Sequence, residues 1–331
     1  MNSIDPALLE SARARLRQLR DEIGKAMVGQ GEPIELLLIA LVASGHVLIE
    51  GVPGLGKTLL ARALSKAVAL RYARIQFTPD MLPSDITGHA VIDSAGAGVA
   101  GAVALRIRRG PVFTHILLAD EINRAPAKTQ SALLEVMQEY QVSLEGETLP
   151  VDRPFHVLAT QNPIDTEGTY PLPEAQLDRF LMKIEIGYPP QADELAIVVR
   201  TTDGAAGDQL PLAEVRECID AAGLLELQRL AGQVHVDQRV IDYAVRIVRA
   251  TRGSLGLAAG SGPRGAIALV RAARAAAIVE GRGFATPDDV KRCCLAVLRH
   301  RVTLAPDAQL EGRQVDELLG ALLQSVVAPR L

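Results

Sequence analysis

The sequence of 331 residues lacks an apolar run long enough to cross a bilayer. The longest run, residues 36–49, contains Gly45 and His46, whereas a membrane span needs about 20 apolar residues. Residues 2–25 mix acids and bases on an amphipathic pattern and therefore lack the apolar core of a signal peptide. We expect a cytoplasmic protein with no direct membrane insertion.

Cysteine and excess positive charge are also scarce. The three cysteines, Cys218 and the adjacent Cys293 and Cys294, have no metal-ligand spacing, so we expect buried reduced thiols. The formal net charge of −4 argues against a surface that clamps a nucleic-acid backbone, although it leaves room for a local basic patch. We therefore expect no nucleic-acid partner.

Apolar runs and helical patterns alternate from residue 47 to residue 186, which predicts an α/β fold with helices on both faces of a parallel sheet. The hydrophobic content of 48% is ample for two domains. The five expected strands are 47–50, 74–77, 116–120, 155–160 and 181–186. The expected helices between them are 57–69, 128–139 and a short one near 174–180.

Two stretches interrupt this alternation. Residues 90–109, mostly Ala, Gly and Val, are expected to form an exposed insert with short strands near 90–92 and 105–107. Residues 140–151 alternate apolar and polar side chains around a turn at 145–147, which predicts a β-hairpin.

Beyond residues 188–190 the strand signal ends, and the pattern predicts a smaller, all-helical second domain. The expected domains are therefore 1–188 and 189–331. Thr286 followed by Pro287 marks a helix start. The glycine-rich residues 253–265 are expected to be either a mobile joint or a plain surface loop.

Residues 51–58 follow the pattern G-x-x-x-x-G-K-[ST] directly after an apolar run, which predicts a phosphate-binding loop. Glycines let the backbone curl around phosphate oxygens, and the following helix adds the positive end of its dipole. Lys57 would reach the β- and γ-phosphates, and Thr58 would offer its hydroxyl to Mg²⁺. A chance glycine-rich turn is the alternative. The residues expected to contact the nucleotide here are Gly51, Val52, Pro53, Gly54, Leu55, Gly56, Lys57, Thr58 and Leu59.

An apolar run ending in two carboxylates, Asp120 and Glu121, follows about sixty residues after Lys57. Asp120 is placed to hold the Mg²⁺ shell, which leaves Glu121 free to polarise a water, because a metal-bound carboxylate is a poor base. Taken alone, such a run is usually a strand entering solvent. Its order after the phosphate loop favours the catalytic interpretation.

Three further polar residues are candidates. Asn162 follows a strand, where open α/β sheets bind ligands, and could fix the attacking water, although Asn before Pro is also a common turn former. Arg179 ends a short helix before the last strand, where an arginine is more often a surface ion-pair residue. Arg264 opens a helix of the second domain, and its alternative is an exposed base.

The chain resembles the AAA+ ATPases, and specifically their MoxR family, over roughly residues 5–320. The matching segments are FTPDMLPSDITG at 77–88, LADEINRAP at 118–126, ATQNP at 159–163 and YPLPEAQLDRF at 170–180. The resemblance implies an AAA+ five-stranded domain with a helical lid. It assigns residues 51–58 to Walker A, Asp120 and Glu121 to Walker B, Asn162 to sensor 1, Arg179 to the arginine finger and Arg264 to sensor 2. The residues that look like the adenine pocket are Val28, Gly29 and Gln30.

The resemblance also implies ATP and Mg²⁺ as cofactors, a hexameric ring, and a finger that acts on the neighbouring subunit's nucleotide. Such proteins remodel or activate a client, in metal-cofactor insertion or complex maturation, together with a von Willebrand factor A domain protein. Residues 88–109 and 140–151 resemble the helix-2 and pre-sensor-1 insertions that face the ring's pore. The small residues 95–104 offer no aromatic grip, which favours remodelling by contact over threading.

Two other functions are weighed against this one. A regulatory scaffold that binds ATP with negligible turnover would need only the phosphate loop, so the set Asp120, Glu121, Asn162, Arg179 and Arg264 argues against it. A monomeric kinase or GTPase is disfavoured because the sequence has no Asn-Lys-x-Asp guanine motif and a kinase needs no intersubunit finger.

Overall fold

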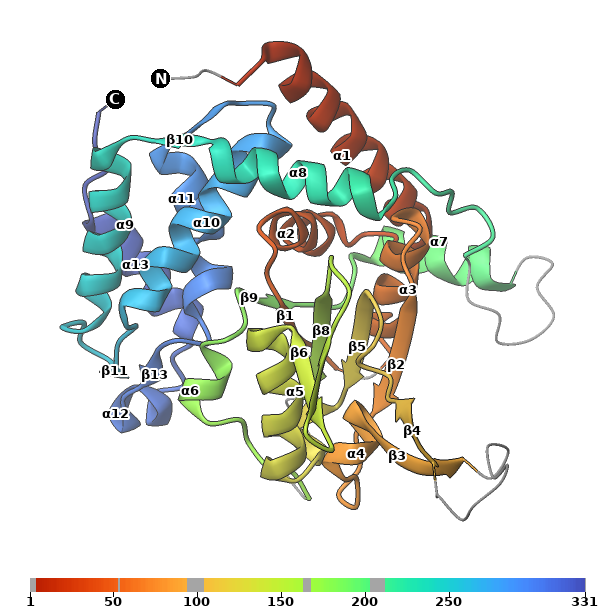
Figure 1. The fold of residues 1–331 in the computed structure, drawn as a ribbon. Coiled ribbons are helices and arrows are strands. Elements are labelled where there is room, and N and C mark those ends of the chain that lie inside the picture. Colours follow the sequence, from red (N-terminus) through yellow and green to blue (C-terminus); the bar gives the residue numbers. More distant parts are fainter. Residues whose placement is uncertain (1–3, 53, 94–103, 163–167, 203–211, 331) are drawn as a thin grey trace.

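The structure, a computed structural model, describes residues 4–52, 54–93, 104–162, 168–202 and 212–330. Five parallel strands form a central sheet in the order β2-β5-β8-β1-β9 (Figure 1). The strands of this sheet are β1 (Val47–Glu50), β2 (Tyr72–Gln76), β5 (Ile116–Asp120), β8 (His156–Gln161) and β9 (Met182–Glu185). The α/β fold predicted from the sequence is confirmed.

Helices and two hairpins surround the sheet. The helices of this half are α1 (Pro6–Ala26), α2 (Gly31–Val42), α3 (Lys57–Ala67), α4 (Pro83–Thr87), the 3₁₀ helix η2 (Ile122–Arg124), α5 (Ala127–Glu139) and α6 (Glu174–Leu177). The hairpins pair β3 (Gly88–Asp93) with β4 (Ala104–Arg109) and β6 (Gln141–Leu144) with β7 (Glu147–Pro150). The stretch of small residues at 95–104 lies outside the described residues, except for residue 104.

The sheet separates two hydrophobic cores, because successive side chains of a strand point to opposite faces. In β5, Ile116 and Leu118 join one core with α1, α2 and α3, whereas Leu117 and Ala119 join the other with α4 and α5. Both faces of β5 are fully buried. This burial explains why the strand reads as an unbroken apolar run before Asp120.

The second half of the chain is mostly helical. Its helices are α7 (Gln191–Thr202), α8 (Ala221–Gln233), α9 (Gln238–Thr251), α10 (Pro263–Val279), α11 (Pro287–Leu298), α12 (Pro306–Leu310) and α13 (Val315–Ser325). Thr286 caps α11 in a capping box with Asp289, at the start that the sequence indicates.

The expectation of an entirely helical second half is wrong in one detail. Two pairs of very short strands join its loops: β10 (His235–Val236) with β12 (Phe284–Ala285), and β11 (Leu257–Ala259) with β13 (Thr303–Leu304). Strands of two or three residues are too short to show a two-residue period in the sequence.

The helical half packs directly on the sheet half. Helix α10 contacts α1, α2 and α8, and α8 also contacts α2 (Figure 1). Buried side chains of α8, α9, α10 and α11 belong to the same continuous core as α1, α2 and α3. The two halves therefore share one hydrophobic core on this side of the sheet.

The glycine-rich residues 253–265 are not the joint between the halves, because they connect α9 to α10 inside the helical half. A Cβ on Gly260 would lie 2.6 Å from the backbone nitrogen of Arg252. Ser261 is buried, and its N–H donates to Thr251 Oγ1 at 2.9 Å. Gly260 thus permits a close backbone approach, whereas a Cβ on Gly253 or Gly262 would meet no atom within 4 Å, and the mobility of this stretch stays a prediction.

Two sequence expectations concern membranes and thiols. Among the described residues, no helix is both long and apolar enough to span a bilayer. All three cysteines are free, and Cys293 and Cys294 are buried, which raises the pKa of each thiol to about 12. Cys218 is only partly buried, so the buried-thiol expectation holds for two of the three.

Candidate active site

The phosphate loop lies between the end of β1 and the start of α3. Gly54 and Gly56 have φ of +87° and +80°, which side chains with a Cβ rarely adopt. A Cβ on Gly51 would lie 2.6 Å from the carbonyl oxygen of Ile186. Each glycine thus meets a backbone requirement, and the loop leads into the N-terminal turn of α3, where helical N–H groups favour an anion. Pro53 falls outside the described residues.

Lys57 begins α3 and turns back into the loop, where its Nζ donates to the carbonyl oxygen of Gly51 at 2.7 Å. Burial lowers the pKa of the Lys57 ammonium, while Asp120, Glu121 and Glu50 act in the opposite direction. The charges of Asp120 and Glu121 therefore act on Lys57. A phosphate would offer the ammonium a stronger acceptor than a neutral carbonyl. Thr58 and Leu59, partly exposed, follow in the same turn.

The segment resembling an adenine pocket lies beside this loop. Gln30 is buried, and its Nε2 donates to the carbonyl oxygen of Gly187 at 3.1 Å. Gly29 has φ of +75° and lies against Asp193 of α7. The sulfur of Met27, directly before Val28, lies 3.4 Å from where a Cβ of Gly56 would be. Residues 27–30 thus join the phosphate loop to the start of α7.

Asp120 ends β5 with both carboxylate oxygens engaged. Its Oδ1 accepts from Thr160 Oγ1 at 2.6 Å, and its Oδ2 accepts from Arg74 at 2.7 and 3.1 Å. Thr160 is fully buried, and its hydroxyl oxygen also accepts the backbone N–H of Glu121 at 2.8 Å. One hydroxyl therefore fixes the side chain of Asp120 and the main chain of Glu121.

Glu121 has a left-handed backbone conformation, with φ of +57°. Its Oε2 accepts from Gln76 Nε2 at 2.9 Å and pairs with Arg124 Nε at 2.8 Å. Gln76 ends β2 directly opposite Asp120 in the strand register. Strain at a residue with a Cβ persists only where surrounding contacts support it, and such strain is frequent at functional sites.

Asn162 is buried directly after β8. Since β8 lies between β5 and β1 in the sheet, Asn162 lies between the strand ends that carry Asp120 and the phosphate loop. The structure thus brings these three elements to the carboxyl edge of one parallel sheet, the edge where such sheets bind ligands.

Four residues around the carboxylates were not predicted from the sequence: Arg74, Gln76, Arg124 and Thr160. A signal was present for Gln76 and Thr160, because each is a polar residue at or near the carboxyl end of a strand that neighbours β5. No comparable local signal marks Arg74 or Arg124, whose roles depend on the paired strands and on the 3₁₀ turn.

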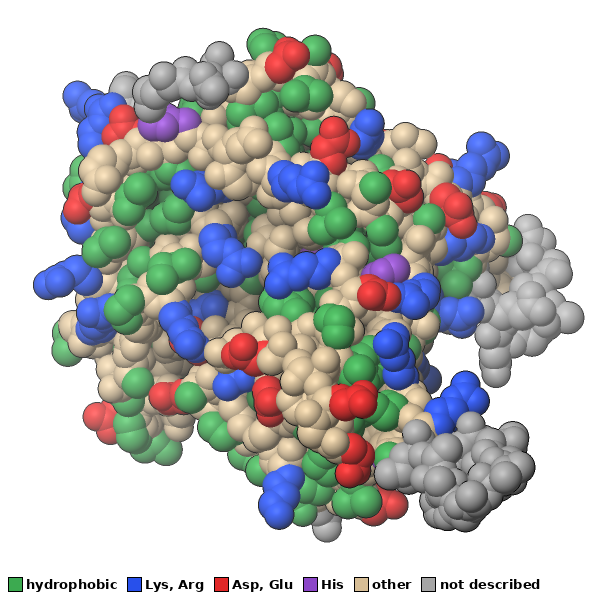
Figure 2. All heavy atoms as spheres, viewed as in Figure 1, with side chains coloured by type: hydrophobic (Ala, Val, Ile, Leu, Met, Phe, Trp, Pro, Cys, Tyr) green, Lys and Arg blue, Asp and Glu red, His purple; other side chains and the backbone are tan. Residues whose placement is uncertain are grey.

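The two predicted arginines lie elsewhere. Arg179, after α6, donates to the carbonyl oxygen of Leu134 at 2.6 Å, in a groove of about 280 Å³ between α5 and α6. Arg264 is 60% exposed and lies 3.8 Å from Asp178. In the parts of the chain that the structure describes, neither arginine forms a hydrogen bond or ion pair with the phosphate loop, Asp120 or Glu121. Figure 2 shows Lys and Arg side chains over α8 and α10, and Asp and Glu side chains over α5.

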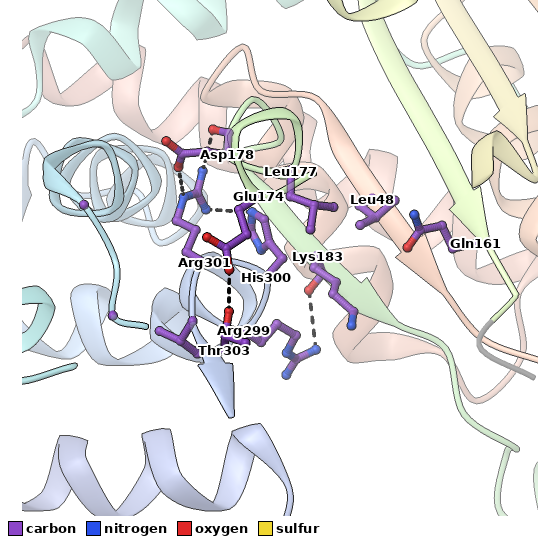
Figure 3. Close-up of a pocket in the computed structure, with 13 residues that line it drawn as sticks. Leu48, Gln161, Glu174, Leu177, Asp178, Lys183, Arg299, His300, Arg301 and Thr303 are labelled. Atoms are coloured by element: carbon purple, nitrogen blue, oxygen red, sulfur yellow. Dashed lines mark hydrogen bonds and ion pairs between the residues drawn. The ribbon is translucent and has the colours of Figure 1, made fainter. Parts of the chain in front are cut away.

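A charged cavity of about 290 Å³ lies between α6, the edge strand β9 and the loop 299–303 (Figure 3). Arg301 in its wall bonds directly to Asp178 at 2.7 Å, and Arg299 lies beside Lys183. Lys183 also pairs with Glu50, the residue before the phosphate loop. The cavity extends from Asp178, the residue before Arg179, to Gln161 at the end of β8.

The donor set suits a magnesium ion that is held mainly by phosphate and water. Within the described ranges, no group of three or more His, Cys, Asp and Glu side chains could hold a metal ion. Thr58 and Asp120 supply only a hydroxyl and a carboxylate. Mg²⁺ commonly takes one or two protein oxygens beside substrate phosphates, so these residues fit it.

Comparison with known proteins agrees with this architecture. The model of the ATPase family associated with various cellular activities (AAA) matches residues 46–182, and that of the AAA lid domain matches residues 249–322. Chaperone MoxR1 of Mycobacterium tuberculosis is 43% identical over 319 residues, which cover 94% of this chain and 81% of that protein.

Two further matches extend over nearly the whole chain. Protein MoxR of Methylorubrum extorquens is 32% identical and covers 99% of this chain and 100% of that protein. The crystal structure of a proposed ATPase from Cytophaga hutchinsonii has a TM-score of 0.87 and 38% identity, covering 97% of each chain. Fold, site and relatives agree, and the chain belongs to the MoxR family of AAA+ ATPases.

Proposed function

We propose that this chain is a Mg²⁺-dependent enzyme that hydrolyses ATP to ADP and phosphate. The observation that carries the proposal is the Thr160 hydroxyl, which locks Asp120 and Glu121 at the same sheet edge as the phosphate loop. A protein that only bound nucleotide would have no need for a carboxylate held so closely in a strained backbone conformation.

Each residue of the edge has a distinct role in this proposal. Lys57 and the first turn of α3 would bind the phosphates, and Thr58 and Asp120 would hold Mg²⁺, which neutralises phosphate charge when bound. Glu121 would orient a water and accept its proton, with its carboxylate directed by Gln76 and Arg124. Asn162 would fix the same water.

Arg179 would act on the nucleotide of a neighbouring subunit. Its guanidinium lies in the groove between α5 and α6 and has no hydrogen bond to the described residues of its own phosphate loop. Arg264 approaches Asp178, the residue beside Arg179, and would be the sensor 2 arginine that contacts phosphate. Hydrolysis would then require a homo-oligomer, for which we propose a hexameric ring.

The ring would act as a chaperone that remodels or activates a client protein, through metal-cofactor insertion or complex maturation. A relative of 43% identity is named as a chaperone, which supports this class of function. A von Willebrand factor A domain protein is the proposed partner. The alternative is a regulatory scaffold that binds ATP with negligible turnover.

Glu121→Gln tests the proposal against the scaffold. The amide keeps the side-chain shape but cannot accept the proton of water, so we expect ATP affinity near wild type and almost no phosphate release. Calorimetry and a phosphate-release assay with Mg²⁺ measure the two quantities. If wild type releases phosphate no faster than the variant, even when mass photometry shows it assembled, the scaffold is correct.

A further inference from the structure

We propose that Arg301 is a positioning residue that fixes the main chain on both sides of Arg179 and so aims the finger at the neighbouring subunit. The proposal rests on the trans role proposed for Arg179. It adds a residue of the helical half to the machinery for hydrolysis, 122 positions from the finger.

Arg301 holds the corner between α6 and β9 through three carbonyl oxygens and one carboxylate. It donates to the carbonyl oxygens of Asp178 at 3.2 Å, Phe180 at 2.5 Å and Leu181 at 3.1 Å. Its Nε donates to Asp178 Oδ1 at 2.7 Å. These acceptors belong to the residue before Arg179 and to the two residues after it, so one guanidinium sets the path of the backbone that carries the finger. Figure 3 shows the bond between Arg301 and Asp178.

The surroundings of Arg301 hold its side chain in one position. Its side chain is 4% exposed, and burial lowers the pKa of its guanidinium. The preceding residue, His300, is also buried, with its Nε2 3.0 Å from the carbonyl oxygen of Phe180. A buried cation is retained at low cost only where its hydrogen bonds are satisfied.

The same corner connects the two predicted arginines. The carboxylate of Asp178 gives one oxygen to Arg301 and lies with the other 3.8 Å from Arg264. The finger's guanidinium, in turn, rests on the carbonyl oxygen of Leu134 in α5. Arg301 therefore stabilises both the backbone that carries Arg179 and the Asp178 carboxylate that lies beside Arg264.

Lysine cannot replace Arg301 in this role. A guanidinium presents five donors in a planar fork, whereas an ammonium is a point charge that cannot reach acceptors spread over residues 178–181. Arg301→Lys keeps the charge but frees part of this backbone. Because displacement by about 1 Å can cost about 10²-fold in rate, we expect a loss of that order in kcat, with ATP affinity and ring size unchanged.

Arg299→Lys is the matched control. Arg299 is also a buried arginine of the loop after α11, with an 11% exposed side chain, and it pairs with Asp316 at 2.6 Å. Its other contacts are the carbonyl oxygen of Lys183 and, at 3.7 Å, the carboxylate of Glu185, so it bonds to none of residues 178–181. We expect this control to hydrolyse ATP within about threefold of wild type.

A double-mutant cycle separates positioning from a general structural role. If Arg301 acts through Arg179, then Arg301→Lys should slow hydrolysis no further in an Arg179→Ala background. A structural role would make the two losses multiply. If Arg301→Lys is poorly folded by thermal unfolding, Asp178→Asn, which keeps an acceptor for Nε, tests the same cycle with a smaller expected loss.

The outcomes are distinguishable. A wild-type rate for Arg179→Ala would overturn the finger and this proposal together. A slow Arg179→Ala variant combined with multiplying losses would overturn the positioning role alone and leave the finger in place. A wild-type rate for Arg301→Lys would likewise overturn the positioning role alone.

Discussion

The phosphate edge of the sheet and the corner that carries Arg179 are assembled in different ways. At the edge, residues 51–58 are contiguous in sequence, and Asp120, Glu121 and Asn162 join them because parallel strands end side by side. At the corner, Arg179 depends on Leu134 of α5 and on Arg301 of the helical half.

The two regions also differ in what they face. The edge gathers the residues proposed to bind phosphate and to activate water, whereas Arg179 bonds to Leu134 in the groove between α5 and α6. The difference agrees with the proposal that one chain holds two incomplete halves of a nucleotide site. One half would bind its own nucleotide, and the other would complete the site of a neighbour.

Lys57→Ala should produce the largest loss of ATP affinity, because it removes the ammonium whose Nζ lies against the carbonyl oxygen of Gly51 inside the loop. A hydrogen bond to a charged group contributes up to about 3 kcal/mol, which corresponds to roughly 10²-fold in affinity. Isothermal calorimetry with ATP measures the effect. Wild-type affinity would show that this loop is not the phosphate site and would contradict the role proposed for the sheet edge.

Thr160→Val should have an intermediate effect on the edge alone. The variant keeps the buried volume but loses the hydroxyl that joins Asp120 to the backbone of Glu121. We expect kcat to fall about 10-fold, because the loss of one or two hydrogen bonds costs about 1–2 kcal/mol. Thr160→Ser retains the hydroxyl and should stay close to wild type. If Thr160→Val and Thr160→Ser hydrolyse ATP at equal rates, the Thr160 hydroxyl does not contribute to hydrolysis.

The smallest expected effect is on stability and not on turnover. It is the pH dependence of the free energy of unfolding, and it tests whether the helical half packs on the sheet at His156. His156 is buried at the start of β8, where its Nε2 accepts from Gln228 of α8 at 3.1 Å and its Nδ1 donates to Gly45. Burial lowers the pKa of His156 to about 4 and that of His46 to about 3, from 6.5.

Between pH 6.5 and 4 the unfolded chain therefore binds more protons than the folded chain, so the free energy of unfolding should decrease as the pH falls. The histidine contribution is fully present above pH 6.5, and each buried histidine removes at most about 1.4 kcal/mol per pH unit below it. Urea unfolding between pH 7.5 and 4.5 measures the slope. A slope for His156→Gln equal to that of wild type would mean that His156 titrates normally and that α8 is not held at this position.

Sequence patterns predicted the sheet, the phosphate loop and the paired carboxylates because these features are local. Residues 51–58 carry their own geometry, and the apolar run before Asp120 reflects a strand buried on both faces. The roles assigned to the loop residues, Asp120, Glu121, Asn162, Arg179 and Arg264 all stay predictions.

Features that depend on distant contacts were not predictable in this way. Thr160 is unremarkable until strand pairing places its hydroxyl against Asp120. Arg301 is one of many arginines until the helical half packs against α6. The need for a glycine at position 260 likewise becomes visible only when the backbone of Arg252 passes close to it.

The central claim is that each chain contributes two separate half-sites, and mixing two inactive variants tests it most directly. Lys57→Ala lacks the phosphate half, and Arg179→Ala should bind ATP normally yet hydrolyse it about 10³-fold or more slowly, as expected for a finger supplied in trans. In a mixed ring, an intact Lys57 pocket can face an intact Arg179.

We expect phosphate release by the co-assembled mixture to exceed that of either variant alone. The rate should depend on the mixing ratio and be highest near equal amounts. A mixture that stays as inactive as its components, although mass photometry with size-tagged subunits shows mixed rings, would contradict the shared site.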